Sequence, residues 1–314
     1  MTRMMSLAGT TLELVERGHG RPLLFLHPGE GLAPERLWLE LLSRRYRVIA
    51  PWHPGYGNSP LMDGAGSVDD LAYLYLDLAA ELKLENAVLV GACFGGWVAA
   101  EMMVRSTARF SHLVLVDPLG IKISGREERD IADMHALPRA EYLKLAWANP
   151  AKGDVDFTSL PERELAAIVR GREAFALYGW KPYMHNPRLR RWLHRIDLPT
   201  LLLWGAEDRI VAPEYGEAGV KQFQEPGPRS FHRPAIPSLG TARSIRRASF
   251  GLCRPNRLEG EIHARLVFFG NGLSPGVGGG AKARVASRSA TQQQLRSQNW
   301  APASQPLSRR IRTV

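Results

Sequence analysis

Cys93 stands where the chain could expose a nucleophile. It is the third residue of GACFGG (91–96), between the aliphatic run AVLV and a segment that reads as a helix. A strand that turns sharply into a helix leaves no room for Cβ atoms beside the turn and forces the residue at its tip outward. The helix N-terminus lowers the pKa of a thiol there and can hold a developing oxyanion. Although a lone cysteine is usually a small buried hydrophobe, the glycines Gly91, Gly95 and Gly96 favour a nucleophile.

Over the first 220 residues, aliphatic runs alternate with segments of helical spacing. Each run is continuously aliphatic, as in strands that are buried on both faces. The alternation predicts an α/β fold in which helices cover both faces of a mainly parallel sheet. The expected strands are 10–18, 22–27, 46–51, 87–91, 112–118 and 200–205. The expected helices, besides the one that follows Cys93, are 36–45 and 67–84.

The strand signal stops between Ile121 and Leu198 and returns at Thr200. Helix-forming residues and aromatics fill this segment. A helical insertion between two sheet strands is typical of a cap over an active site, although the aromatics could also form only the core of the insertion. We therefore expect core segments at 1–120 and 199–220, a helical cap at 121–198 and an atypical tail at 221–314.

The charge of the chain is distributed unevenly. The net charge is +10, but residues 221–314 hold 16 Lys and Arg against 3 Asp and Glu, whereas residues 1–220 hold 25 against 28. Such arginine clusters could bind nucleic acid or an anionic surface, but no nucleic-acid-binding motif accompanies them. The Gly- and Ser-rich composition predicts disorder, with one incidental strand-like run, ARLVFFG, at 264–270. Because the last strand of the sheet falls in this tail, we expect an exposed sheet edge.

Cysteine content and hydropathy bound the class of protein. Cys93 and Cys253 cannot form a disulfide framework, and neither lies in a CxxC pair. No apolar run reaches the length of a membrane span, and the start MTRMMSLAGTT lacks the apolar core of a signal peptide. We expect a cytoplasmic protein with a small-molecule substrate, no metal, no organic cofactor and no specific nucleic-acid or membrane partner. No pattern indicates its oligomeric state.

Residues 1–220 resemble the α/β-hydrolase superfamily, through motifs in the expected order. GACFGG resembles the nucleophile elbow G-x-S-x-G, with Cys in place of the commoner Ser, as in the dienelactone hydrolases of this superfamily. HPGEG (27–31) resembles the oxyanion loop. PWHPGYGNSP (51–60) resembles a loop in which Asp is common where this chain has Trp52. The resemblance implies an α/β-hydrolase fold with a helical cap.

The resemblance also assigns roles to further residues. LLLWGAEDRIVAP resembles the strand and loop that carry the acid of a catalytic triad, which implies this role for Asp208. Asp117, at the end of another strand, is the alternative candidate for the acid. The backbone N–H groups of Gly29, Glu30 and Phe94 would form the oxyanion hole. The order nucleophile, acid, histidine is the order of this fold.

The histidine of the triad is the missing member. The superfamily places it in a Gly-His turn a few tens of residues after the acid, and this chain has no such turn. His232 is the first candidate and His263 follows, but Gly precedes neither. Without a base, only a few per cent of a thiol is ionised at neutral pH, and the deacylating water loses its proton acceptor.

The tail itself suggests a reason for the missing turn. A base string that encodes LGTARSIRR (239–247) gives, one base later, a peptide similar to the helix after the His turn of this superfamily. We hypothesise that the reading frame shifts near residues 218–232, so that 221–314 is not an evolved domain.

Other polar residues near these motifs have more ordinary interpretations. His27 and His53 are expected to orient loops, and His112, which begins a strand, to be structural. Glu30 could touch the substrate.

Three functions remain open. The first is hydrolysis of a small ester, lactone or thioester, in which a histidine oriented by Asp208 activates Cys93 and then water. The second is carbon–carbon bond hydrolysis, because NPRLRRWLHRIDLPTLLLWG (186–205) resembles the cap-to-core junction of such hydrolases. The third is a catalytically inactive hydrolase-fold protein that binds a ligand or partner.

Overall fold

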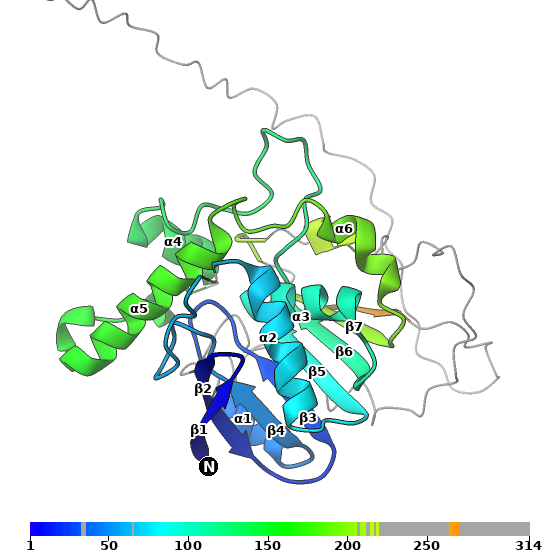
Figure 1. The fold of residues 1–314 in the computed structure, drawn as a ribbon. Coiled ribbons are helices and arrows are strands. Elements are labelled where there is room, and N and C mark those ends of the chain that lie inside the picture. Colours follow the sequence, from blue (N-terminus) through cyan, green and yellow to red (C-terminus); the bar gives the residue numbers. More distant parts are fainter. Residues whose placement is uncertain are drawn as a thin grey trace, which may run out of the picture. The chain divides into compact units, whose positions relative to one another are not determined.

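The computed structural model describes residues 1–32, 36–64, 66–147, 149–205, 208–211, 214–216, 218–219 and 264–269. An eight-stranded sheet in the order β1-β2-β4-β3-β5-β6-β7-β8 forms its centre (Figure 1). The strands are β1 (Thr2–Leu7), β2 (Thr10–Arg17), β3 (Pro22–Leu26), β4 (Arg47–Pro51), β5 (Ala87–Ala92), β6 (Phe110–Val116), β7 (Thr200–Gly205) and β8 (Ala264–Phe269).

Parallel pairing joins the five central strands β4, β3, β5, β6 and β7. β1 with β2 and β2 with β4 pair antiparallel. The predicted α/β fold with a mainly parallel sheet is therefore confirmed. The sequence did not reveal β1, because its side chains alternate between exposed and half-buried positions and none is fully buried.

The expectation of an exposed edge beside β7 is wrong for the backbone that the structure describes. β8 pairs antiparallel with β7, from Thr200 opposite Phe269 to Gly205 opposite Ala264. The strand-like run in the tail supplies β8, so the N–H and C=O groups of β7 have partners on both sides.

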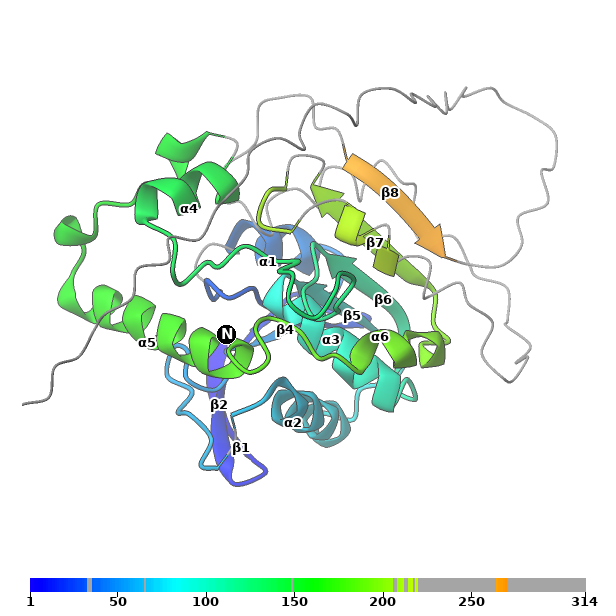
Figure 2. The ribbon, with the colours of Figure 1, turned by 90° about the horizontal axis from the view of Figure 1, so that it is seen from above.

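Helices cover both faces of the sheet, and each face has its own core. α2 (Val68–Glu81) and α3 (Phe94–Arg105) lie on one face and α1 (Arg36–Ser43) on the other (Figure 2). Successive side chains of β3 point to opposite faces. Leu24 and Leu26 accordingly belong to the cluster that α2 and α3 complete, whereas Leu23 and Phe25 belong to the cluster with Trp38 of α1.

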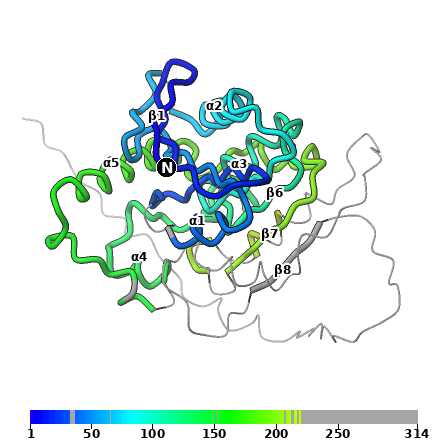
Figure 3. The backbone as a smooth tube through the Cα atoms, turned by 90° about the horizontal axis from the view of Figure 1, so that it is seen from below, coloured from blue at the N-terminus to red at the C-terminus, as the bar shows by residue number. Residues whose placement is uncertain are grey.

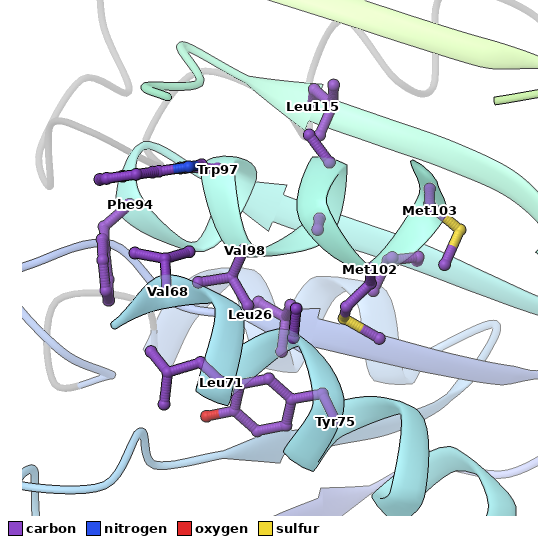
Figure 4. Close-up of a cluster of buried hydrophobic side chains, with 14 of the residues drawn as sticks. Leu26, Val68, Leu71, Tyr75, Phe94, Trp97, Val98, Met102, Met103 and Leu115 are labelled. Atoms are coloured by element: carbon purple, nitrogen blue, oxygen red, sulfur yellow. The ribbon is translucent and has the colours of Figure 1, made fainter. Parts of the chain in front are cut away.

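α2 begins at a reciprocal cap and buries one face against α3. The backbone N–H of Asp70 donates to the Ser67 hydroxyl, and the Asp70 carboxylate accepts from the N–H of Ser67. Figure 4 shows the contact between the two helices, where Leu71 and Tyr75 lie below Val98 and Met102. These side chains are buried almost completely, which fixes α3, the helix that follows Cys93, against α2.

The segment between β6 and β7 forms helices, as the sequence predicts. They are α4 (Arg139–Ala146), α5 (Glu162–Gly179) and α6 (Leu189–Trp192), with short 3₁₀ turns. Figure 3 traces the chain from β6 through α4 and α5 before it returns to β7. Within the described residues, no helix combines the length and the hydrophobicity that a membrane span needs.

Candidate active site

Cys93 lies between β5 and α3 in a backbone conformation that residues with a Cβ atom rarely adopt. Its φ is 48° and its ψ is −109°. The N–H of Cys93 donates to Val116 O over 2.8 Å, and its carbonyl accepts from the N–H groups of Gly96, Trp97 and Leu119. Such a conformation costs roughly 1–3 kcal/mol and persists only where the surroundings enforce it. These bonds hold the cysteine at the tip of the elbow with its side chain partly exposed.

The three glycines of the elbow occupy places in which a Cβ atom would clash. A Cβ on Gly91 would lie 2.4 Å from the carbonyl oxygen of Gly95. On Gly95 it would lie 2.2 Å from Leu26 O, and on Gly96 2.8 Å from Pro118 Cβ. The glycine spacing of the sequence therefore reflects close approach of α3 to β5, to β3 and to the segment after β6.

The HPGEG loop follows β3 and lies beside the elbow. It turns at residues 28–31, where Gly31 N–H donates to Pro28 O over 3.0 Å. Gly29 packs against the ring of Phe175 from α5, which a Cβ on Gly29 would approach to 2.6 Å. The Phe175 ring meets the Phe94 ring edge to face, 5.2 Å between centroids. The loop, the residue after Cys93 and the insertion thus meet at one place.

His27 and His53 are fully buried under this loop, and their hydrogen bonds fix a neutral form of each. His27 Nδ1–H donates to Pro28 O over 2.7 Å, while its Nε2 accepts from the backbone N–H of His53 over 3.0 Å. His53 Nε2–H donates to His27 O over 3.0 Å, and its Nδ1 accepts from the Tyr75 hydroxyl.

Burial lowers the pKa of both imidazoles. The pKa of His27 falls well below its usual value, with the neighbouring His53 as a second cause, and that of His53 falls to about 4. Both rings are held by their partners, which agrees with the prediction that they orient loops.

Glu30 connects the HPGEG loop to the insertion. The Tyr142 hydroxyl of α4 donates to Glu30 Oε1 over 3.2 Å. Glu30 as a whole residue is exposed, but protein atoms around its carboxyl group remove hydration from it, and this desolvation raises the pKa of Glu30. The predicted contact of Glu30 with a substrate stays a prediction.

Asp117 and Asp208 lie around Gly205, at the ends of two adjacent strands. Gly205 N–H donates to Asp117 Oδ1 over 2.7 Å. A Cβ on Gly205 would lie 3.7 Å from Asp208 Cβ and 3.8 Å from Asp117 Oδ1. Asp208 Oδ1 also accepts from the N–H groups of Ile210 and Val211, at 2.9 Å each. The structure therefore brings the expected acid and its fallback together.

His232, the predicted base, lies outside the described residues. So do His263, Cys253 and the part of the proposed frame-shift region that follows residue 219. Within the described part of the chain, no histidine nitrogen is hydrogen-bonded to Cys93. His112 contacts Arg21 and Ser111 at the start of β6, in agreement with a structural role. Nor do the described residues contain a group of three or more His, Cys, Asp or Glu that could hold a metal ion. The place of His232 relative to Cys93 stays a prediction.

Sequence patterns did not single out the tyrosines of the site. The Tyr56 hydroxyl donates to Gly29 O over 3.0 Å, and that of Tyr75 reaches His53. Tyr56 belongs to the PWHPGYGNSP motif, which was the available signal, but the partner of its hydroxyl depends on how two loops meet.

Comparisons with known proteins agree with this geometry. A family model described as the alpha/beta hydrolase family matches residues 19–235. The AB hydrolase superfamily protein YisY of Bacillus subtilis (strain 168) is 29% identical over 229 residues, 68% of this chain and 85% of the relative. The 2-hydroxymuconate semialdehyde hydrolase of Pseudomonas sp. (strain CF600) is 33% identical over 229 residues, 67% of this chain and 78% of the relative.

Solved structures share the fold. The meta-cleavage product hydrolase of Pseudomonas fluorescens IP01 superposes with a TM-score of 0.56 at 19% identity, over 70% of this chain and 85% of that one. An esterase from a Rhodococcus species superposes with a TM-score of 0.54 at 22% identity, over 70% and 86% of the two chains. At these identities the similarity concerns the fold alone.

Proposed function

The chain belongs to the alpha/beta hydrolase family, and on that premise we propose that it hydrolyses a small ester, lactone or thioester through a covalent intermediate on Cys93. The strained elbow is the observation that carries this proposal. The thiol of Cys93 is partly exposed at the N-terminus of α3. Its backbone has a φ of 48°, and three glycines around it occupy places in which a Cβ atom would clash. The dipole and N–H groups at a helix N-terminus stabilise a thiolate and a nearby oxyanion.

In the proposed first half-reaction, the thiolate of Cys93 attacks the carbonyl carbon and forms a C–S bond. The electron pair of the C=O π bond moves to oxygen, and the N–H groups of Gly29, Glu30 and Phe94 donate to the oxyanion. The tetrahedral intermediate then collapses, expels the alcohol or thiol and leaves an acyl group on Cys93. The leaving group takes the proton that the base received from the Cys93 thiol.

In the second half-reaction, water replaces the leaving group. A histidine oriented by Asp208 removes a proton from the attacking water, and a second oxyanion forms in the same hole. His232 is the first candidate for this histidine, and Asp117 is the fallback for Asp208. Collapse of this intermediate releases the carboxylic acid and returns the thiol.

A burst assay with p-nitrophenyl acetate on the full chain tests the proposal. The wild type should release nitrophenol in a rapid burst equal to the concentration of sites, and Cys93→Ala should show no burst. Turnover after the burst would indicate a working base, and its loss in His232→Ala would identify that base. Equal release by the wild type and Cys93→Ala would refute the proposal and leave the inactive ligand-binding protein as the better hypothesis.

Carbon–carbon bond hydrolysis is the second candidate. The 33% identity with an enzyme named 2-hydroxymuconate semialdehyde hydrolase supports it. To distinguish the two proposed activities, the rates at which one preparation consumes 2-hydroxymuconate semialdehyde and p-nitrophenyl acetate would be measured. A kcat/KM that is larger for the semialdehyde, and that Cys93→Ala abolishes, would favour this second activity.

A further inference from the structure

Three consecutive carbonyl groups of the HPGEG loop each accept a hydrogen bond from a buried side chain. His53 Nε2–H donates to His27 O, and His27 Nδ1–H donates to Pro28 O. The Tyr56 hydroxyl donates to Gly29 O. The three donors are between 0% and 2% exposed, so water does not compete for these carbonyls.

Two of these bonds, those to Pro28 O and Gly29 O, also set the direction of an N–H group; the residue after His27 is a proline and has none. The C=O of one residue and the N–H of the next belong to the same planar peptide and point in opposite directions. The bond to Pro28 O therefore orients the N–H of Gly29, and the bond to Gly29 O orients the N–H of Glu30. These two N–H groups are the donors that the proposed function assigns to the oxyanion hole. In the structure the Glu30 N–H interacts with the carboxylate of its own residue, which the substrate oxygen would replace.

The peptide between Gly29 and Glu30 is the one that needs a constraint. It is the central peptide of the turn that the Gly31-to-Pro28 hydrogen bond closes. Type I and type II turns differ by a rotation of about 180° of this central peptide. In the rotated form, the Glu30 N–H would point away and the Gly29 carbonyl would take its place.

Tyr56 is itself held rigidly. Its backbone N–H donates to His53 O over 2.9 Å, and its ring lies 4.8 Å from the His27 ring. Gly171 of α5 also approaches so closely that a Cβ there would lie 2.9 Å from the Tyr56 ring. Burial raises the pKa of the Tyr56 hydroxyl, which therefore remains a donor at any ordinary pH.

We propose that Tyr56 is a positioning residue of the oxyanion hole: its hydroxyl prevents rotation of the Gly29–Glu30 peptide and keeps the Glu30 N–H directed toward the acyl oxygen. This inference rests on the proposed function. It adds a residue that does not touch the substrate and acts through one backbone carbonyl.

Two reactions of the same thiol distinguish this role from a general structural one. Acylation of Cys93 by p-nitrophenyl acetate develops an oxyanion, whereas alkylation by iodoacetamide is a direct displacement that develops none. Tyr56→Phe removes only the hydroxyl. We expect it to slow acylation by about tenfold to a hundredfold, at or below the loss that follows removal of one oxyanion donor, while the alkylation rate stays within about twofold of the wild type.

Tyr178→Phe is the matched control. Tyr178 is equally buried, and its hydroxyl also donates to a loop carbonyl, Pro54 O, over 3.2 Å, but not to the HPGEG loop. It should acylate and alkylate like the wild type. The inference is overturned if Tyr56→Phe acylates as fast as Tyr178→Phe, or if its acylation and alkylation slow in the same proportion. A wild type that forms no acyl adduct on Cys93 would instead refute the proposed function, and this inference with it.

Discussion

The carboxylate of Glu101 on α3 accepts a hydrogen bond of 2.8 Å from the side chain of Asn186, which precedes α6 in the inserted segment. Its Oε1 also accepts from Trp97 Nε1 over 3.2 Å, and its Oε2 pairs with Arg105 over 2.6 Å. Glu101 is only 1% exposed. One buried carboxylate therefore fastens the insertion to the helix that begins at Cys93.

Loss of this carboxylate should destabilise the protein strongly. Glu101→Ala leaves Trp97 Nε1–H and the Asn186 side chain without their partner, whereas Arg105 keeps its ion pair with Asp69. We expect a loss of about 3 kcal/mol in the free energy of unfolding. Asn186→Ala removes a single bond and should cost about 1 kcal/mol. Urea unfolding of both variants measures whether Glu101→Ala loses more free energy of unfolding than Asn186→Ala. Equal losses in the two variants would show that the Asn186 contact carries the whole effect.

Gly95→Ala should prevent the elbow from forming. The added Cβ would lie 2.2 Å from Leu26 O, a backbone atom that cannot move without shifting β3. We expect a loss of about 3 kcal/mol or more in stability, together with loss of the Cys93 burst. Gly125→Ala is the control, since its Cβ would meet nothing closer than 3.9 Å. Thermal unfolding of the two variants compares them, and similar midpoints would contradict the elbow geometry.

The stability of the protein should fall as the pH drops from about 6.5 to about 4, because the pKa of His53 is lowered to about 4 in the folded state. In this window the unfolded chain binds a proton at His53 and the folded chain does not. One such group contributes a decrease of about 3 kcal/mol across the window. The pH dependence of urea unfolding should become shallower in His53→Gln and stay unchanged in His19→Gln, a substitution at an exposed histidine. Equal slopes in all three proteins would contradict a neutral buried His53.

The two neighbouring carboxylates should differ in catalysis. Asp208→Asn should lower kcat by up to about 10⁴-fold, the loss seen when the acid of a triad can no longer orient its histidine. Asp117→Asn keeps an oxygen that can accept from Gly205 N–H and should retain most of the activity. Steady-state kinetics with p-nitrophenyl acetate measures both. The opposite order would move the acid role to Asp117.

The sequence predicts the central part of this fold because the signals there are local. Continuous aliphatic runs predict β3 to β7, and the glycine spacing predicts the elbow. The sequence did not predict β1, because no residue in that strand is fully buried. The role of Tyr56 could not be predicted either, since its partner Gly29 is far away in the sequence and reached only after two loops fold together. The acid pair around Gly205 likewise depends on the pairing of β6 with β7.

The central claim is that Cys93 is the nucleophile, and peptide mapping by mass spectrometry tests it most directly. The full chain would be incubated briefly with p-nitrophenyl acetate, quenched in acid and digested. The account predicts one acetyl group on the peptide that contains Cys93, present in Cys253→Ser and absent in Cys93→Ala. An acetyl group that appears only on another residue, or equal labelling in Cys93→Ala, would contradict it.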